Sequence, residues 1–544
     1  MILCGLVAAA LYLPTLKYQL VWDDVDLIVQ NRSSPFAAFG HDFWHGRASE
    51  FLGKDPYYRP LANLSFGIDE VIAGHRAWYF HLVNLLLHAV FVMLAAVVLW
   101  RAFGRAGPTV VCGLLLAVHP MFADSVAYVS GRTDVLCGIG LLAALLGLMR
   151  LRQRPDMRSV LLMWAGYAVA LFSKETGALF ILAAFVFAFA VRRRGRVERP
   201  IWVGLAGLVV LLAGYLLLRV IVLGSVLGMR GPGNPVAQLF LALNGLGLAL
   251  VRFVVPFSSS VFSWDAGLMS RPTFWLIPAV AFLVLPFLVK ALRRSWLAEF
   301  GWLWAWLFLL PVVALSGFGP SGRLLYIPGI GVVLVLGLLI QEWTKTKSQI
   351  QRASFAVGLV WCAVLLPFTL SRMTVWHDGF TLFSRMTREA PGYAAGHFNM
   401  AFELRQRSQL DAAVTEYRTT IALDSTAALA YSNLGAVLQS QGKLDEAEKL
   451  YRKTIELQPE YPLAWNNLAI VLYKRGDGSG AISALRKAIQ LKPDDAGAVY
   501  NLGRIYQQAN MPDSARACFE RAYQLSPADS RIRASYDQTH GVKP

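Results

Sequence analysis

Long apolar runs recur through the first two thirds of this chain, and they constrain its fold more than any other feature. A helix of about 20 apolar residues spans the hydrocarbon core of a bilayer, where helices and closed barrels alone satisfy their backbone polar groups. The runs predict an all-α, polytopic membrane bundle over residues 1–375. We mark eleven of them, at about 2–20, 79–100, 108–122, 134–149, 159–173, 177–191, 201–223, 273–290, 300–316, 325–341 and 354–371.

The composition supports a lipid-solvated bundle. The chain is 56% hydrophobic and 16% charged, whereas soluble domains are nearer half apolar and a quarter charged. Residues 1–390 carry 33 Lys and Arg against 18 Asp and Glu, while residues 391–544 carry 18 against 16. The basic excess therefore belongs to the membrane part. Positive charge in cytoplasmic loops explains this excess better than nucleic-acid binding does.

Basic residues concentrate in alternate loops of the bundle, and this pattern predicts its orientation. These loops fall on one side if the first run crosses from inside to outside, so the positive-inside rule places the N-terminus in the cytoplasm. Residues 21–78 then form the first extracytoplasmic loop. The loop residues are Arg101, Arg105, Arg150, Arg152, Arg154, Arg158, Arg192, Arg193, Arg194, Arg196, Arg199, Lys290, Arg293, Arg294, Lys345, Lys347 and Arg352.

One further run, 236–256, complicates the count. It is apolar enough to span, but counting it breaks the parity of the later basic loops, so we expect it to dip into or lie on the outer face. Eleven spans place the C-terminal part outside, whereas twelve would place it in the cytoplasm. Residues 2–16 lack a basic n-region and a small-residue cleavage site, which favours a retained first span over a signal peptide.

Three carboxylates follow the first apolar run, in the stretch Val21-Trp22-Asp23-Asp24-Val25-Asp26. Acids in that place lie at a membrane surface. A carboxylate there can act as a general base, and we assign that role to Asp23 first and Asp24 second. Two other interpretations stay open: the aspartates could bind a divalent metal, or they could cap the following segment.

Polar residues are unusually numerous near the predicted outer ends of the runs. Ionisable groups at membrane depth are costly, so they usually face a cavity and are functional. The alternative is that some are interfacial anchors or hydrogen-bond partners between helices. The residues are His81, Asn84, His88, His119, Asp124, Arg132, Asp134, Lys174, Glu175 and Arg323.

A 34-residue period begins after the last run and predicts an α-solenoid of four tetratricopeptide repeats (TPRs), at 394–427, 428–461, 462–495 and 496–529. Small residues recur at position 8 and proline near the end of most repeats, as close helix packing and helix termination require. Residues 376–393 are a predicted linker, and 530–544 a predicted capping helix and tail.

Position 6 of all four repeats is asparagine. This position lies on the first helix of each repeat, which lines the concave surface, and a carboxamide can both donate to and accept from a peptide backbone. The column therefore predicts a binding surface for an acceptor or partner polypeptide, although asparagine is also common at this position in such repeats. The four residues are Asn399, Asn433, Asn467 and Asn501.

Short motifs occur in a characteristic order along the chain. They are Val21-Trp22-Asp23-Asp24, Tyr58-Arg59-Pro60-Leu61, His81-Leu82-Val83-Asn84, Ala117-Val118-His119-Pro120, Gly131-Arg132-Thr133-Asp134, Lys174-Glu175 and Arg323-Leu324-Leu325-Tyr326-Ile327-Pro328. This order, followed by the repeats, resembles the transmembrane and TPR-containing protein O-mannosyltransferases of the GT-C glycosyltransferase superfamily. The family usually has an acidic residue where this chain has Gly322, often has glutamate in place of Asp124, and has more repeats.

The resemblance implies a GT-C-like membrane enzyme with its site on the non-cytoplasmic face. The donor would be a polyprenyl-phosphate sugar, typically dolichyl phosphate mannose, and the acceptor a Ser or Thr hydroxyl. The TPR domain would lie outside the cytoplasm, in a bacterial periplasm or an endoplasmic-reticulum lumen. No cofactor would be obligatory, because phosphate is already a good leaving group and the cationic side chains already present can hold it.

A cation must hold the donor phosphate, and arginine does this with a bidentate fork. We assign that role to Arg323 first, then Arg132, with Lys174 assisting. The supporting polar residues are Arg59, His81, His119, Asp124, Asp134 and Glu175.

Two other function classes compete with a transferase. The bundle could be a non-enzymatic, membrane-anchored scaffold that displays the repeats for complex assembly, but such a scaffold has no need of an acidic step facing arginines. A transporter is less favoured, because no inverted repeat is visible and the polar groups gather at one face rather than at the midplane.

Overall fold

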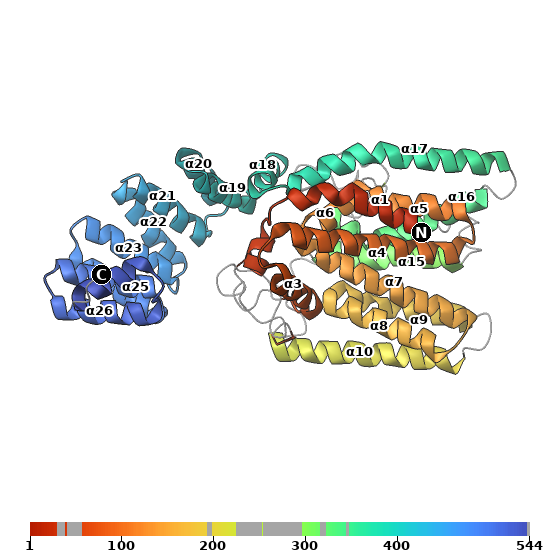
Figure 1. Cartoon of the computed structure of the whole chain (residues 1–544), viewed down its shortest axis with the longest axis horizontal. Coiled ribbons are helices and arrows are strands. Elements are labelled where there is room, and N and C mark those ends of the chain that lie inside the picture. Colours follow the sequence, from red (N-terminus) through yellow and green to blue (C-terminus); the bar gives the residue numbers. More distant parts are fainter. Residues whose placement is uncertain are drawn as a thin grey trace. The chain divides into compact units, whose positions relative to one another are not determined.

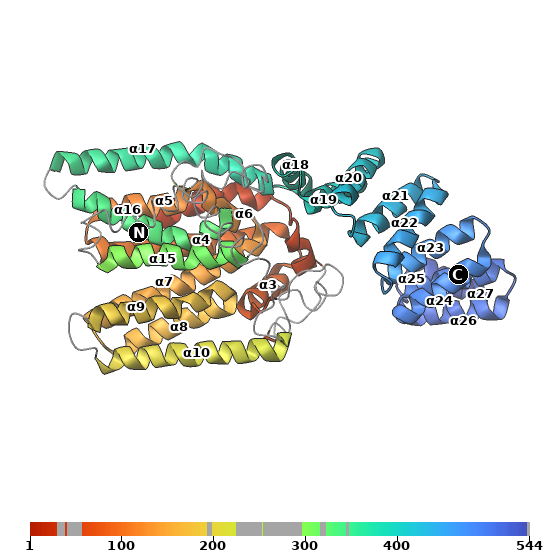
Figure 2. The ribbon, with the colours of Figure 1, turned by 180° about the vertical axis from the view of Figure 1, so that it is seen from behind.

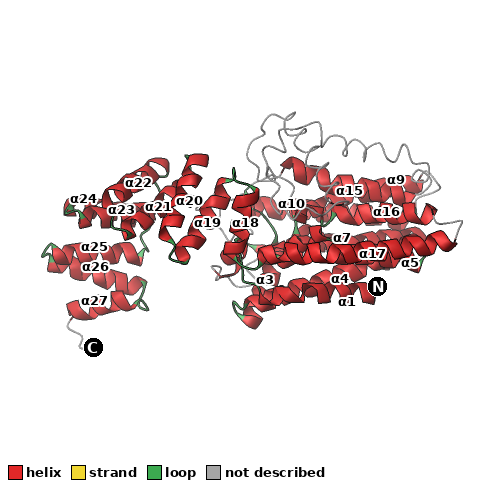
Figure 3. Cartoon of the chain, turned by 90° about the horizontal axis from the view of Figure 1, so that it is seen from above, coloured by secondary structure: helices red, strands yellow, loops and turns green. Residues whose placement is uncertain are grey.

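The computed structural model describes residues 1–29, 39–40, 57–192, 198–224, 253, 296–315, 322–343 and 348–540. These residues contain helices and no strand (Figure 3), which confirms the all-α prediction. The chain divides into two compact units, Met1–Ala390 and Pro391–Pro544. The predicted span 273–290 and, apart from Phe253, the run 236–256 lie outside the described residues.

The first unit is a bundle of helices lying side by side (Figures 1 and 2). Its helices are α1 (Ile2–Tyr12), α3 (Pro60–Ala73), α4 (Ala77–Phe103), α5 (Ala106–Val118), α6 (Ala123–Ala127), α7 (Arg132–Gln153), α8 (Met157–Ser173), α9 (Phe180–Arg192), α10 (Arg199–Leu223), α15 (Trp296–Leu315), α16 (Pro328–Trp343), α17 (Ser348–Met373) and α18 (Gly379–Glu389). Short turns of 3₁₀ or π helix join them, at η1 (Leu13–Lys17), η2 (Val25–Val29), η4 (Pro120–Phe122), η5 (Val129–Gly131), η6 (Glu175–Leu179), η7 (Gly322–Leu325) and η8 (Thr374–Trp376).

Apolar helices long enough to cross a membrane occur within the described residues. Four qualify singly: Ala77–Phe103, Val129–Gln153, Arg199–Leu223 and Ser348–Trp376. Large apolar side chains on α10 remain exposed, as a lipid-facing helix requires; Val210 is 70% exposed. The total of eleven spans stays a prediction.

The run predicted at 108–122 is a bent pair rather than one straight helix. α5 ends at Val118, and the chain turns by 48° before η4 and α6. Pro120 explains the break, because it has no N–H and holds the preceding His119 in an extended conformation, with ψ of 128°. The His119 imidazole then accepts a hydrogen bond from the Met121 N–H at 3.2 Å.

The ends of the bundle differ in chemistry because consecutive helices alternate in direction. α3 lies at the end opposite the N-terminus of the chain (Figure 1). The helices α4 and α7 begin at that end, and α8, α10 and α17 finish there (Figures 1 and 2). This end, which we call the α3 end, therefore collects the acidic step and the predicted polar residues.

Glycines allow α7 and α8 to pack with their backbones in contact. A Cβ on Gly140 would lie 2.6 Å from the Ala170 nitrogen, and one on Gly166 would lie 2.4 Å from the Ala144 nitrogen. Both neighbours are backbone atoms and cannot rotate away. Small residues bring membrane helices together in this way, and the contact fixes Asp134 on α7 relative to Lys174 after α8.

Replacing Gly140 with valine is expected to separate α7 from α8 and to destabilise the bundle by about 1–3 kcal/mol, the usual cost of overpacking. The apparent melting temperature of the detergent-solubilised protein measures this effect. Gly214→Ala on α10 is the matched control, since its Cβ would meet nothing within 4 Å. Equal melting temperatures for Gly140→Val and the wild type would contradict the packing argument.

The second unit contains four helix pairs, and its helical solenoid agrees with the predicted fold class. The first helices of the repeats begin 34 residues apart, and each second helix packs against its own first helix. A Cβ on Gly435 would lie 2.9 Å from the Tyr451 ring, which shows why position 8 is small. The helix pairs are α19 (Ala394–Gln406) with α20 (Leu410–Leu423), α21 (Ala428–Ser440) with α22 (Leu444–Leu457), α23 (Pro462–Lys474) with α24 (Gly478–Leu491), and α25 (Ala496–Gln508) with α26 (Pro512–Leu525).

A final helix, α27 (Ser530–His540), follows the repeats, and its Ile532 packs against Val499 and Ala522. At the other junction, the residues expected to form a linker, 376–393, contain the end of η8 and the whole of α18. Both belong to the first unit, which extends to Ala390.

Candidate functional site

The acidic step after η1 forms a tight turn. Trp22 adopts a left-handed backbone conformation with φ of 54°, which is costly for a bulky residue and typical of functional sites. The Asp24 N–H donates to the Val21 carbonyl at 3.1 Å. In return, the Val21 N–H donates to the Asp24 carboxylate at 3.2 Å. We call residues 21–24 the acidic turn.

Asp24 anchors this turn to the loop before α7. Its side chain is completely buried, and its Oδ1 accepts hydrogen bonds from the Ser130 N–H at 2.8 Å and the Ser130 hydroxyl at 2.5 Å. Burial raises the pKa of the Asp24 carboxyl to about 7, although the hydrogen bonds from Ser130 act in the opposite direction. A carboxyl enclosed in this way is suited to holding the turn in place.

Asp23, in contrast, is partly exposed. Its Oδ2 accepts a hydrogen bond of 2.7 Å from the Tyr128 hydroxyl. Burial raises the pKa of Tyr128 well above its ordinary value, so this hydroxyl stays protonated and acts as the donor. One oxygen of Asp23 is thereby fixed in direction by a residue from the loop that also holds Asp24.

Arg323, on η7, reaches the same place from a distant part of the chain. Its guanidinium carbon lies 5.9 Å from the centroid of the Tyr128 ring, and its side chain is half-buried. The structure therefore brings Asp23, Tyr128 and Arg323 together at the α3 end. A carboxylate and an arginine around one aromatic ring are the parts that a proton transfer and an anion site require.

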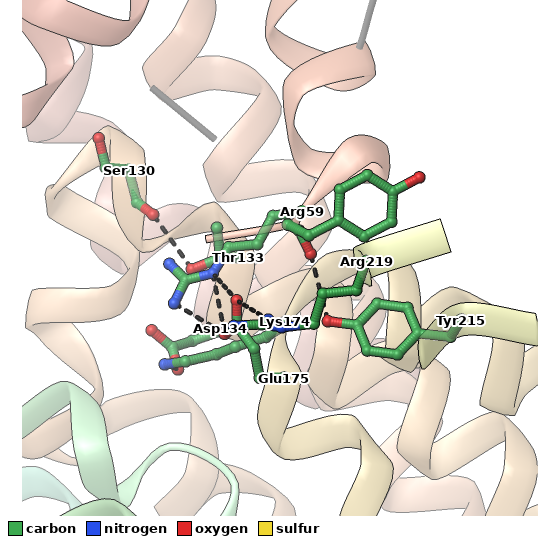
Figure 4. Close-up of polar contacts among 9 residues, drawn as sticks. Arg59, Ser130, Thr133, Asp134, Lys174, Glu175, Tyr215 and Arg219 are labelled. Atoms are coloured by element: carbon green, nitrogen blue, oxygen red, sulfur yellow. Dashed lines mark hydrogen bonds and ion pairs between the residues drawn. The ribbon is translucent and has the colours of Figure 1, made fainter. Parts of the chain in front are cut away.

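Charged side chains from the loop before α3, from α7, from the end of α8 and from α10 form a second group, the Glu175 cluster (Figure 4). Arg59 and Glu175 form a two-pronged ion pair, with N–O distances of 2.9 and 3.2 Å, and Arg219 of α10 lies 3.7 Å from Glu175. Lys174 forms an ion pair with Asp134. The cluster thus contains three cations and two carboxylates, and it ties α8 to the loop before α3, to α7 and to α10.

One hydrogen bond links the Glu175 cluster to the acidic turn. The Thr133 hydroxyl donates to the Ser130 carbonyl at 3.3 Å, as Figure 4 shows. Ser130 holds Asp24, while Asp134, next to Thr133, holds Lys174. Residues 130–134 therefore join the two groups through the first turn of α7.

Arg132 is fully buried between α7, α3 and α4. Its Nη1 lies 2.5 Å from the Asp69 carboxylate, and its Nε donates to the Asn84 side chain at 2.6 Å. Its remaining nitrogen donates to the Phe80 carbonyl at 3.1 Å. The guanidinium is thus engaged with the protein on all sides.

The predicted supporting residues His81, His119 and Asp124 also contact other elements. A ring nitrogen of His81 lies 3.4 Å from the Gln19 carbonyl, and one of His119 lies 2.8 Å from the Phe253 carbonyl. Asp124 on α6 accepts two hydrogen bonds from Arg372 of α17, at 2.9 and 2.7 Å. These contacts connect helices around the acidic turn.

Several residues of the site have no counterpart among the sequence predictions: Asp69, Tyr128, Ser130, Arg219 and Arg372. Arg219 and Arg372 had a usable signal, because each is a basic residue within or directly after an apolar run, at the end opposite the basic loops. Asp69, Tyr128 and Ser130 had none, since aspartate, tyrosine and serine are ordinary residues in a polar loop or a short helix.

The asparagines of the repeats lie on α19, α21, α23 and α25, and all four are half-buried. Two of them show how the amides are oriented. Asn399 donates to the Ala395 carbonyl at 2.8 Å, and Asn501 donates to the Asn466 side chain of the preceding repeat at 2.9 Å.

Among the described residues, no group of three or more His, Cys, Asp or Glu side chains could hold a metal ion.

Parts of both units are similar in sequence to known protein families. Residues 60–217 match the family described as dolichyl-phosphate-mannose-protein mannosyltransferase, and residues 403–442, 432–496 and 472–537 match tetratricopeptide-repeat families. Protein O-mannosyl-transferase TMTC4 of Homo sapiens is 27% identical over 493 residues, which cover 76% of this chain and 65% of that protein.

The resemblance to the TPR-containing protein O-mannosyltransferases is confirmed. Tmtc2 of Drosophila melanogaster is 31% identical over 289 residues, and tmtc2 of Xenopus laevis is 36% identical over 145 residues. These alignments cover 49% and 26% of this chain but only 30% and 17% of the fly and frog proteins. Among solved structures, MamA aligns with a TM-score of 0.25 at 22% identity, over 27% of this chain and 83% of that one.

Proposed function

We propose that this protein is a membrane glycosyltransferase that moves a sugar, mannose by analogy with its relatives, from a polyprenyl-phosphate donor to Ser or Thr hydroxyls of proteins. The observation that carries the proposal is the arrangement of Asp23, Tyr128 and Arg323. A partly exposed carboxylate, oriented by a tyrosine hydroxyl, and a half-buried arginine lie around the same tyrosine ring at one end of an apolar bundle. The named activity of the relatives fits this arrangement.

The reaction is a single displacement at the anomeric carbon. The acceptor hydroxyl oxygen forms the new bond to that carbon, while the bond from the carbon to the phosphate oxygen breaks. Asp23 takes the proton of the acceptor hydroxyl as the hydroxyl oxygen attacks, and the polyprenyl phosphate leaves with the electrons of the broken bond. The hydrogen bond from the Tyr128 hydroxyl fixes the direction of the Asp23 carboxylate, which would orient it toward the acceptor hydroxyl.

Arg323 would hold the donor phosphate. The geometry favours it over Arg132, whose guanidinium is already engaged with Asp69, Asn84 and Phe80. We therefore assign Arg132 a positioning role at the start of α7. Lys174 and Arg59 would contribute positive potential from the Glu175 cluster, where cations outnumber carboxylates. The lipid tail would lie against apolar helix surfaces.

The proposed orientation follows from the alternating helices. Basic residues such as Arg101 and Arg154 end α4 and α7 at the end of the bundle opposite the acidic turn. If the positive-inside rule holds, this basic end faces the cytoplasm and the α3 end faces the periplasm or lumen. The repeats would then bind the acceptor polypeptide on the non-cytoplasmic side.

A reconstituted assay tests the proposal. The purified full chain is incubated with radiolabelled polyprenyl phosphate mannose and Ser/Thr-containing peptides, and label in peptide is counted after lipid extraction. Transfer above a protein-free control is the expected result. A wild-type protein that transfers no label with any donor sugar or peptide would favour the scaffold interpretation.

Double replacement of Asn433 and Asn467 by alanine is expected to raise the KM for a long acceptor peptide about tenfold. Two lost hydrogen bonds to a bound backbone, at about 0.5–1.5 kcal/mol each, account for this change. The kcat and the KM for the donor are expected to stay the same. Gln490→Ala on the exposed surface of α24 is the control, and unchanged peptide KM in the double variant would remove the asparagines from acceptor binding.

A further inference from the structure

The segment between the last apolar helix and the repeats folds back over the acidic turn. It comprises η8 and α18, residues 374–389, and we call it the pre-repeat segment. Asp378 starts α18 by accepting a hydrogen bond from the Thr381 N–H at 2.8 Å. The whole segment belongs to the first unit, and Trp376 and Phe383 within it are 4% exposed.

Two contacts attach the pre-repeat segment to the chain around the acidic turn. The Gln19 N–H donates to the His377 carbonyl at 3.0 Å, immediately before the turn. The Phe383 ring lies 6.2 Å from the Trp22 indole in an edge-to-face arrangement. Trp22 is the residue held in the left-handed conformation, so Phe383 helps to support the strained position of the turn.

Trp376 makes the contact that bears on the chemistry. Its indole stacks on the Tyr128 ring, with centroids 4.7 Å apart and planes inclined by 22°. Its N–H donates to the Asp124 carboxylate at 3.2 Å, which Arg372 grips with two further hydrogen bonds. The buried Arg372–Asp124 pair therefore sets the plane of Trp376, and Trp376 sets the plane of the ring whose hydroxyl orients Asp23.

We propose that Trp376 is a positioning residue of the transferase site, so that the pre-repeat segment completes the geometry around Asp23. The inference rests on the proposed function. Simple core filling would require burial alone. Here the indole uses its single N–H on a fixed carboxylate and its ring face on Tyr128, and the aromatic contact therefore limits how far the Tyr128 hydroxyl can move from Asp23.

The test compares kcat with KM in the full chain, using the reconstituted assay. Trp376→Leu keeps an apolar side chain but removes both the ring and the N–H, and we expect kcat to fall about 30-fold, because small misplacements in an active site cost up to about a hundredfold. The KM values for donor and peptide should stay within about twofold. Trp376→Phe keeps a stacking ring and should recover most of kcat. Trp202→Ala, at a 48% exposed tryptophan on α10, is the control.

A double-mutant cycle shows whether Trp376 acts through Tyr128. Tyr128→Phe keeps the stacked ring and removes the hydroxyl, and adding Trp376→Leu to it should cause little further loss of kcat. Multiplying losses would overturn the inference, as would a Trp376→Leu defect confined to KM or equal losses in the Leu and Phe variants. A wild-type chain without transfer activity would instead refute the proposed function, so the two failures are distinguishable.

Discussion

Asparagine in place of Asp23 is expected to lower kcat for sugar transfer about 10³-fold, within the range of about 10²–10⁴ that general-base catalysis contributes. The amide keeps the size of the carboxylate, and its oxygen can still accept the hydrogen bond from Tyr128, so the acidic turn should stay in place. What is lost is the ability to take the proton of the acceptor hydroxyl. Single-turnover transfer of labelled sugar to peptide, at saturating donor, measures the effect.

Two further variants serve as controls for Asp23→Asn. Glu70→Gln on α3 removes another partly exposed carboxylate, 27% exposed, and should leave kcat unchanged. Asp24→Asn should reduce stability as well as activity, because the buried Asp24 holds the turn to Ser130. Asp23→Asn protein that unfolds at the wild-type temperature and keeps full activity would remove Asp23 as the base.

Methionine in place of Arg372 is expected to destabilise the bundle by about 3–5 kcal/mol, the usual cost of breaking a buried ion pair from one side. The Asp124 carboxylate would keep its hydrogen bond from Trp376 but would lose its countercharge, while only 1% exposed. Methionine has a similar length and is apolar, so the loss reports mainly the unpaired charge. The apparent melting temperature in detergent measures it.

Two further variants show whether Arg372→Met destabilises the bundle through lost charge or through lost packing. Arg388→Ala on α18 removes an exposed arginine and should not change the melting temperature. The double variant Arg372→Met with Asp124→Leu removes both charges, and it should recover much of the lost stability because no buried charge is left unpaired. A double variant that is less stable than Arg372→Met alone would contradict this explanation.

Asp23→Asn and Arg372→Met affect opposite ends of one series of contacts. Asp23, the proposed base, lies at one end of a series of contacts that runs through Tyr128 and Trp376 to Asp124 and Arg372. Asp23 itself is partly exposed, whereas Tyr128, Trp376, Asp124 and Arg372 are almost fully buried. We therefore expect loss of activity without unfolding at one end, and loss of stability at the other.

Helix type and order could be predicted from the sequence because they depend on local patterns. Runs of apolar residues predicted α4, α7, α10 and α17, and a 34-residue period predicted the helix pairs of the second unit. The predicted limits lie within six residues of the observed ones. The bend at His119-Pro120 was missed. Hydropathy continues smoothly across that point, and only the backbone restriction imposed by proline, which hydropathy does not measure, breaks the helix there.

The polar residues of the site could be named from sequence, but their partners could not. Arg132 and Arg323 both appeared as arginines at the predicted outer face. The structure encloses Arg132 against Asp69, 63 positions before it, and leaves Arg323 half-buried beside Tyr128. Ion-pair partners are chosen by the packing of separate helices, and sequence spacing carries no record of that choice.

The sequence by itself determined that this chain has an apolar helical bundle with an acidic step after its first helix, followed by four repeats. Only the tertiary structure decided what each aspartate of that step can do. Asp23 and Asp24 are adjacent and chemically identical. Ser130, 106 residues further along, encloses Asp24, while Tyr128 meets Asp23 at the surface of the turn. Burial and hydrogen-bond partners differentiate the two carboxylates, and both arise from packing between distant segments.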